Sequence, residues 1–162
     1  MYIVNMDTNI IVLGDTKVGK TSIINQYLQH SLTDSDNNDN FNLIDYSGKC
    51  KDSISISKYI HNCKIIVIVF DLNNESTFTS ADIWYKLITS FIRPTNICFY
   101  LVGNKNDLDH TIGYNDIEQY AKYRNMVYYS INVNDIKPLF KSIKNTLITS
   151  PNKTSRICNW FF

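Results

Sequence analysis

This chain of 162 residues lacks several features that mark special classes of protein. No apolar run approaches the ~20 residues of a membrane span. Residues 1–7 contain neither a cationic region nor a long apolar one, so we expect no signal peptide. With a net charge of +1 and no basic stripe interleaved with aromatics, we expect no nucleic-acid partner. No Cys-x-x-Cys pair occurs, and the spacing suits reduced thiols in the cytoplasm at Cys50, Cys63, Cys98 and Cys158.

What is present is ordinary in amount. Hydrophobic residues make up 44% of the chain and charged residues 19%, as in soluble globular proteins. The length is sufficient for one domain with a sizeable core. Glycine is scarce, with only five in the chain, and four of these lie in or beside three short motifs, at Gly14, Gly19, Gly48 and Gly103. The placement of these few glycines is therefore informative.

The first motif, at residues 14–21, reads Gly-Asp-Thr-Lys-Val-Gly-Lys-Thr and matches G-x-x-x-x-G-K-[ST]. It follows a mostly β-branched run at 9–13 and precedes a segment with apolar residues at helical spacing. A strand, a glycine-bounded loop and a helix start direct backbone N–H groups and a positive dipole end at a phosphate. We therefore expect Lys20 to contact the β- and γ-phosphates and the Thr21 hydroxyl to bind Mg²⁺.

The second motif is Asn-Lys-Asn-Asp at residues 104–107, after an apolar run at 96–102 that predicts a buried strand. The Asp107 carboxylate offers two acceptors in one plane, which match the ring N–H and exocyclic amino group of guanine. Adenine has no such pair of donors, and the wrong base would leave a charge unpaired. Four residues alone are weak grounds, but together with the phosphate loop they predict a guanine nucleotide.

The third motif has the form D-x-x-G and runs from Asp45 to Gly48 after an apolar run. A carboxylate at a strand end can hold Mg²⁺ through water, and the Gly48 N–H can approach a γ-phosphate because no Cβ intervenes. By itself this motif is better explained as a strand and a turn; beside the other two, a metal role is favoured. Another weak signal is Ser130-Ile131-Asn132, where a backbone N–H could bond the guanine O6.

Apolar runs alternate with amphipathic segments along the chain. The runs at 9–13, 41–45, 64–70, 97–102 and 126–130 predict strands, and the segments at 20–29, 52–61, 76–91, 115–124 and 135–148 predict helices. This order predicts an α/β fold with a mainly parallel central sheet of about five strands and helices on both faces. Ligands bind beyond the carboxyl ends of such strands, where the motifs fall.

On these residues the chain resembles small GTPases of the Ras superfamily, nearest the Rab branch, over about residues 8–148. The sequence Val-Phe-Asp-Leu-Asn-Asn-Glu-Ser-Thr-Phe at 69–78, with Trp84 after it, and residues 101–108 add to the resemblance. It implies a P-loop NTPase G domain over residues 1–150, a tail at 151–162, and a switch in vesicle transport that binds GTP and GDP with Mg²⁺ and hydrolyses GTP slowly. It also implies that Lys105 lies across the base and that Asn104 ties the base turn to the phosphate loop.

The resemblance assigns the site residues as follows. Those for the nucleotide are Gly14, Asp15, Thr16, Lys17, Val18, Gly19, Lys20, Thr21, Ser22, Asn104, Lys105, Asp107, Leu108, Ser130, Ile131 and Asn132; those for the metal are Thr21 and Asp45; and those for catalysis are Lys20 and Gly48.

The chain departs from the family around the γ-phosphate. Only 23 residues separate Thr21 from Asp45, so the first switch and the family's second strand are expected to be missing or cut short. Thr33 either replaces the metal-sensing threonine or is a chance residue in a polar loop, and we favour the loop. Lys49 stands where the family has a water-orienting Gln, and since Lys lacks an acceptor, hydrolysis should be slow. Lys17 stands where many relatives have Gly, and nucleotide binding should survive this.

The end of the chain departs as well. Cys158 is fifth from the end, so no standard prenylation motif is present, and membrane association stays open. We expect a cytoplasmic monomer, with peripheral attachment to an endomembrane undecided and with effector or regulatory proteins as partners. A second hypothesis is a pseudo-GTPase that keeps guanine nucleotide as a structural part of an interaction module. A nucleotide kinase is not supported, because it would not need the turn at 104–107.

Overall fold

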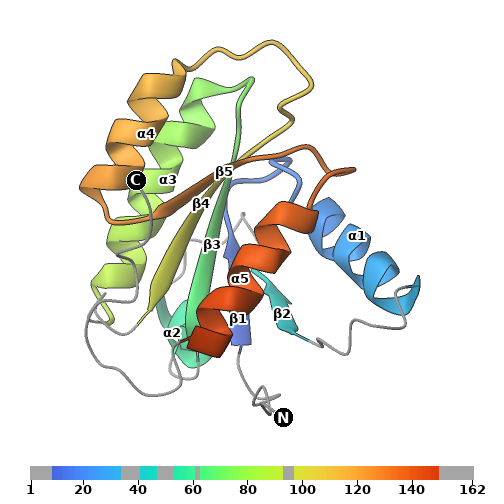
Figure 1. Cartoon of the computed structure of the whole chain (residues 1–162). Coiled ribbons are helices and arrows are strands. Elements are labelled where there is room, and N and C mark those ends of the chain that lie inside the picture. Colours follow the sequence, from blue (N-terminus) through green and yellow to red (C-terminus); the bar gives the residue numbers. More distant parts are fainter. Residues whose placement is uncertain (1–8, 34–40, 47–52, 61–62, 93–96, 150–162) are drawn as a thin grey trace.

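The computed structural model describes residues 9–33, 41–46, 53–60, 63–92 and 97–149. Its strands are β1 (Asn9–Leu13), β2 (Asn42–Asp45), β3 (Cys63–Asp71), β4 (Cys98–Asn104) and β5 (Val127–Ser130). Its helices are α1 (Lys20–Thr33), α2 (Ser53–Ile60), α3 (Glu75–Thr89), α4 (Tyr114–Tyr123) and α5 (Lys137–Thr149). The strands form one sheet in the order β2-β1-β3-β4-β5, and every neighbouring pair is parallel (Figure 1).

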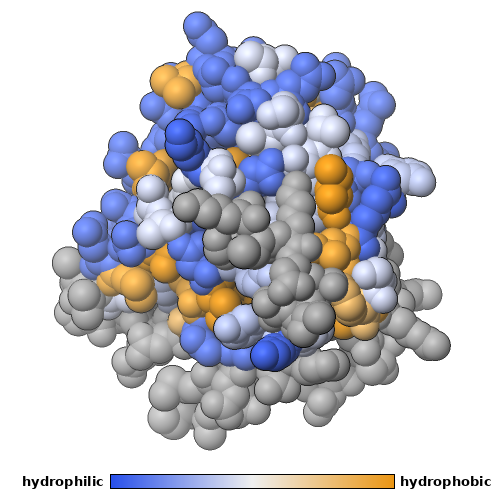
Figure 2. Space-filling model, turned by 180° about the vertical axis from the view of Figure 1, so that it is seen from behind, coloured by the Kyte–Doolittle hydropathy of each residue, from blue (hydrophilic) through white to orange (hydrophobic). Residues whose placement is uncertain are grey.

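The central strands β1, β3 and β4 are almost fully buried and mainly apolar, because helices cover both faces of the sheet. Along β1, Ile10 and Val12 pack with residues of α1 and α5, whereas Ile11 and Leu13 pack with residues of α2, α3 and α4. This alternation follows from the two-residue period of a strand. The carboxyl ends of all strands lie at one edge, toward the top of Figure 1, and the described surface there is mainly hydrophilic when seen from behind (Figure 2).

The structure confirms the predicted α/β fold and the order of its elements, with one correction. Helix α1 continues to Thr33, whereas we expected it to end near residue 29 and placed Thr33 in a loop. The last turn carries little apolar periodicity, so no local pattern indicates a helix there. It is supported by the Ser31 hydroxyl, which donates to the Tyr27 carbonyl at 2.9 Å.

Strand β2 is an edge strand that pairs only with β1, in parallel. Eight residues separate Thr33 from Asn42, and no antiparallel pair occurs among the described residues. The expectation of a shortened first switch concerns residues 34–40, which lie outside the described residues and leave it a prediction. Gly48, Lys49 and Cys158 lie outside them too. No helix in the described part of the chain is long and apolar enough to cross a membrane.

Candidate functional site

The predicted site residues gather at the carboxyl edge of the sheet. The phosphate loop follows β1, Asp45 ends β2, Asn104 ends β4 and Ser130 ends β5. Because all five strands are parallel, residues far apart in sequence meet at this edge. Lys20 is the first residue of α1, so the loop leads directly into the helix N-terminus, where backbone N–H groups favour anions.

The phosphate loop closes around the ammonium of Lys20. This side chain is 7% exposed, and its Nζ donates to the carbonyls of Gly14 at 3.0 Å and Asp15 at 2.7 Å. Burial lowers the pKa of Lys20, and the carboxylates of Asp45 and Asp15 act against this change. A buried ammonium that faces the helix N-terminus is suited to receive phosphate oxygens.

Two glycines and one left-handed lysine shape this loop. Gly14 has φ 141° and Gly19 has φ 99°. A Cβ on Gly14 would lie 2.1 Å from the Val69 carbonyl oxygen, and one on Gly19 would lie 2.2 Å from Nδ2 of Asn104. Lys17 has φ 66°, a left-handed conformation that costs a non-glycine residue roughly 1 kcal/mol. The backbone path therefore depends on close packing rather than on loop flexibility.

The Thr21 hydroxyl and the Asp45 carboxylate face each other beside Lys20. Oγ1 of Thr21 donates a hydrogen bond to Oδ2 of Asp45 at 2.5 Å. Two oxygen atoms that can bind a metal ion, one from α1 and one from β2, therefore lie next to each other. Mg²⁺ commonly takes one or two protein oxygens and completes its octahedron with phosphate oxygens and water. Among the described residues no cluster of three His, Cys, Asp or Glu side chains is arranged for a metal ion. These two residues therefore fit Mg²⁺ that arrives with a phosphate.

The base turn is tied to the phosphate loop through Asn104. This residue is 3% exposed, and its Nδ2 donates to the Val18 carbonyl at 2.9 Å. The turn is also bonded to the loop after β5, since the Asn106 N–H donates to the Ile131 carbonyl at 3.1 Å. Asp107 is exposed. The protein by itself therefore does not bury this carboxylate.

A residue to which we assigned no site role, Asp71, holds the second residue of the base turn. Nζ of Lys105 lies 2.5 Å from Oδ2 of Asp71, a nearly buried carboxylate at the end of β3. Lys105 itself has φ 63°. This contact holds the ammonium of Lys105 at the edge of the sheet. The available signal was an acidic residue directly after an apolar strand, as at Asp45.

Trp84 also contacts the predicted site, although our sequence analysis used it only as part of the family resemblance and gave it no site role. Its indole Nε1 donates to Oδ1 of Asp15 at 3.0 Å, and its ring meets Tyr46 edge to face, with centroids 6.1 Å apart. Trp84 is completely buried. It therefore connects the phosphate loop with the residue that follows Asp45.

The other predicted residues take the following places. Ile131 is buried at the base of the turn, and exposed side chains at the same edge of the sheet are those of Thr16, Lys17, Ser22, Leu108 and Ser130, with Asn132 half-buried. Asn132 donates from Nδ2 to Oδ1 of Asn106 at 3.3 Å. The structure thus brings together all predicted nucleotide and metal residues, and leaves Gly48 outside the described part.

Comparisons with known proteins agree with this geometry. A family model described as "Ras family" matches residues 31–149. Ras-related protein RabP of Dictyostelium discoideum is 30% identical over 149 residues, which cover 82% of this chain and 64% of RabP. Ypt/Rab-type GTPase ypt7 of Pyricularia oryzae is 29% identical over 123 residues, covering 63% and 60%, and GTP-binding protein YPTC5 of Chlamydomonas reinhardtii is 29% identical over 118 residues, covering 60% and 57%.

The chain therefore spans about three fifths of the length of these curated relatives. The family match begins after the phosphate loop, so the loop geometry at Gly14–Thr21 is a separate observation. A parallel five-stranded sheet, a buried loop lysine and a base turn bonded to that loop accompany the match. The chain belongs to the Ras family, and it is similar to Ras-related and Ypt/Rab-type proteins.

Proposed function

We propose that this chain binds GTP and GDP with Mg²⁺, hydrolyses GTP slowly and acts as a switch in vesicle transport. The observation that carries the proposal is the hydrogen bond from Asn104 to Val18, which joins the base turn to the phosphate loop. It holds the base turn beside the phosphate loop, which is the arrangement that a ligand with both a base and phosphates requires. The Ypt- and Rab-type names of the relatives support the transport role.

The reaction that we propose uses a small set of side chains. Lys20 neutralises charge that develops on the phosphates, and Thr21 and Asp45 would hold Mg²⁺, which when bound would supply further positive charge. The Gly48 N–H contacts the γ-phosphate, and Lys49 in place of Gln leaves the attacking water poorly oriented. Both residues lie outside the described part of the chain, and their roles come from the motif. We also propose that effector and regulatory proteins bind this chain and that it binds peripherally to an endomembrane.

Base recognition is tested with Asp107→Asn. Loss of a bidentate, charge-assisted pair should weaken GDP binding by about 100-fold or more. The variant should prefer xanthosine diphosphate, because the asparagine amide can donate to the carbonyl that replaces the amino group. The matched control is Asp109→Asn, an exposed aspartate two residues on, which should bind GDP as the wild type does. Unchanged guanine selectivity in Asp107→Asn would overturn the base assignment.

Turnover is tested separately by single-turnover GTP cleavage with and without Mg²⁺. We expect slow, Mg²⁺-dependent cleavage that Lys49→Gln accelerates and Lys20→Ala abolishes. The nucleotide carried by the purified protein identifies the resting state. Cleavage no faster than that of free GTP, with tight GDP binding retained, would replace the switch by the pseudo-GTPase.

A further inference from the structure

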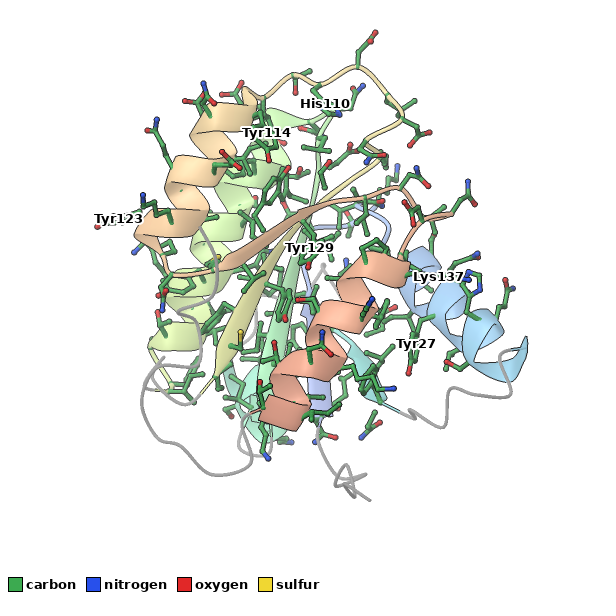
Figure 3. All side chains as sticks on the ribbon, viewed as in Figure 1. Tyr27, His110, Tyr114, Tyr123, Tyr129 and Lys137 are labelled. Atoms are coloured by element: carbon green, nitrogen blue, oxygen red, sulfur yellow. The ribbon has the colours of Figure 1, made fainter. Side chains whose placement is uncertain are left out.

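A groove of about 480 Å³ lies between α1 and α5, away from the nucleotide site. Figure 3 shows Tyr27 of α1 and Lys137 of α5 on the sides of the two helices that face each other. None of the described residues that line the groove is among the predicted nucleotide or metal residues. Its volume lies in the range of about 300–1,000 Å³ that is usual for ligand sites.

The floor of the groove is aromatic. The rings of Tyr27 and Phe140 stack with centroids 4.3 Å apart, and Phe41, which precedes β2, stacks on Tyr27 at 5.5 Å. Tyr27 and Phe140 are each 8% exposed, whereas Phe41 is half-buried. An apolar side chain that lies on this floor is stabilised because it leaves water and contacts the faces of the rings.

The rim of the groove is cationic. Three lysines of α5 line it: Lys137, Lys141 four residues later, and Lys144 three residues after that. This spacing places them on one face of the helix, over a length of about 10 Å. His30 lies on the α1 side, and no Asp or Glu is among the described lining residues. No ion pair given for the described residues involves Lys137 or Lys141, which are both exposed. The rim therefore selects for negative charge.

We propose that this groove docks an acidic segment of a partner protein that carries a large apolar side chain. That side chain lies on the aromatic floor, and carboxylates on either side of it meet the lysines of α5. A row of charges about 10 Å long spans three or four residues of an extended peptide at ~3.3 Å each. The buried rings lie below exposed lysines, so the flat surface of a bilayer can meet the rim but not the floor.

The probe for this proposal is a fluorescein-labelled peptide, Asp-Asp-Phe-Leu-Asp-Asp-Gly, titrated by fluorescence anisotropy into the full 162-residue chain. The test variant is Lys137→Glu with Lys141→Glu. The matched control is Lys58→Glu with Lys64→Glu, two exposed lysines on α2 and β3 that do not line the groove. Both doubles change the net charge from +1 to −3, since each substitution subtracts two. Non-specific attraction is therefore reduced equally.

We expect the groove double to weaken peptide binding about tenfold and the control double by less than about twofold. A peptide with Ser in place of Phe and Leu should lose about tenfold or more. Equal losses in both doubles, or undiminished binding of the Ser peptide, would overturn the proposal. Vesicles of phosphatidylserine and phosphatidylcholine that bind the wild type and not the groove double, with no peptide binding, would assign the surface to a membrane and overturn it as well.

Amide chemical shifts of the wild-type protein test the groove without any substitution. Amide chemical shifts on addition of the peptide should change in α1 and α5, around Tyr27 and Lys141. Changes centred on α3 and α4 instead would place the peptide elsewhere and refute the groove. Binding of GDP, followed in the same samples, reports separately on the nucleotide site, so failure of one proposal leaves the other intact.

Discussion

The bond between Asn104 and Val18 makes a sharp prediction for Asn104→Ala. The substitution removes a side-chain amide that donates to a backbone carbonyl over 2.9 Å at a position only 3% exposed. Losing the bond costs about 1 kcal/mol, and leaving the Val18 carbonyl buried and unpaired adds about 1–3 kcal/mol. Oδ1 of Asn104 has no partner among the described residues, so its removal offsets part of this. We expect a net loss of about 1–2 kcal/mol in the free energy of unfolding.

The larger effect should appear in nucleotide release. With the base turn no longer tied to the phosphate loop, the two ends of the pocket move independently, and GDP should dissociate about tenfold faster. The free energy of unfolding is measured by guanidinium denaturation followed by circular dichroism. Release is measured by stopped-flow displacement of N-methylanthraniloyl-GDP. Mg²⁺ is kept constant in all samples.

The matched control for this prediction is Asn73→Ala. Asn73 also donates from Nδ2 to a backbone carbonyl, that of Asp109 at 2.8 Å, but it is exposed and does not touch the phosphate loop. It should change the free energy of unfolding by less than about 0.5 kcal/mol and GDP release hardly at all. If Asn104→Ala released GDP at the wild-type rate, the tie between the two motifs would have no role in binding, and our reasoning would fail.

Three further predictions concern buried groups. Trp84→Phe removes the indole donor to Asp15 and should speed GDP release several-fold, as measured by stopped-flow displacement. An unchanged rate would show that Trp84 does not position the phosphate loop. Burial raises the pKa of Tyr100 from 10.0 to about 12. Between pH 10 and 12 the unfolded chain therefore binds fewer protons than the folded chain, and the free energy of unfolding should fall by about 2–3 kcal/mol. Unfolding curves of Tyr100→Phe should show a smaller fall over the same range. Cys63 is only 7% exposed, and burial raises the pKa of its thiol to about 11. Ellman's reagent should therefore react with Cys63 at pH 8 only after unfolding, and reaction of this thiol in the native state would contradict its placement.

Much of this fold was predictable because its signals are local. The run at 9–13 is apolar after Asn9 and forms β1, and the periodic segment at 115–124 corresponds to α4 within one residue at each end. The last turn of α1 was not predictable, because it carries polar residues whose helical state depends on propagation from earlier turns. The loss of the family's second strand in this chain stays a prediction, since residues 34–40 lie outside the described part.

The sequence by itself determined the order of the elements and predicted a guanine-nucleotide ligand, because both depend on residues that are neighbours in the chain. The tertiary structure alone decided which distant residues touch. Lys105 meets Asp71 across 34 positions, Trp84 meets Asp15 across 69, and Asn104 meets Val18 across 86. These contacts follow from the strand order and register of the sheet, which long-range hydrogen bonds set and which no local pattern encodes. The groove between α1 and α5 has the same origin, since it exists only once both helices cover one face.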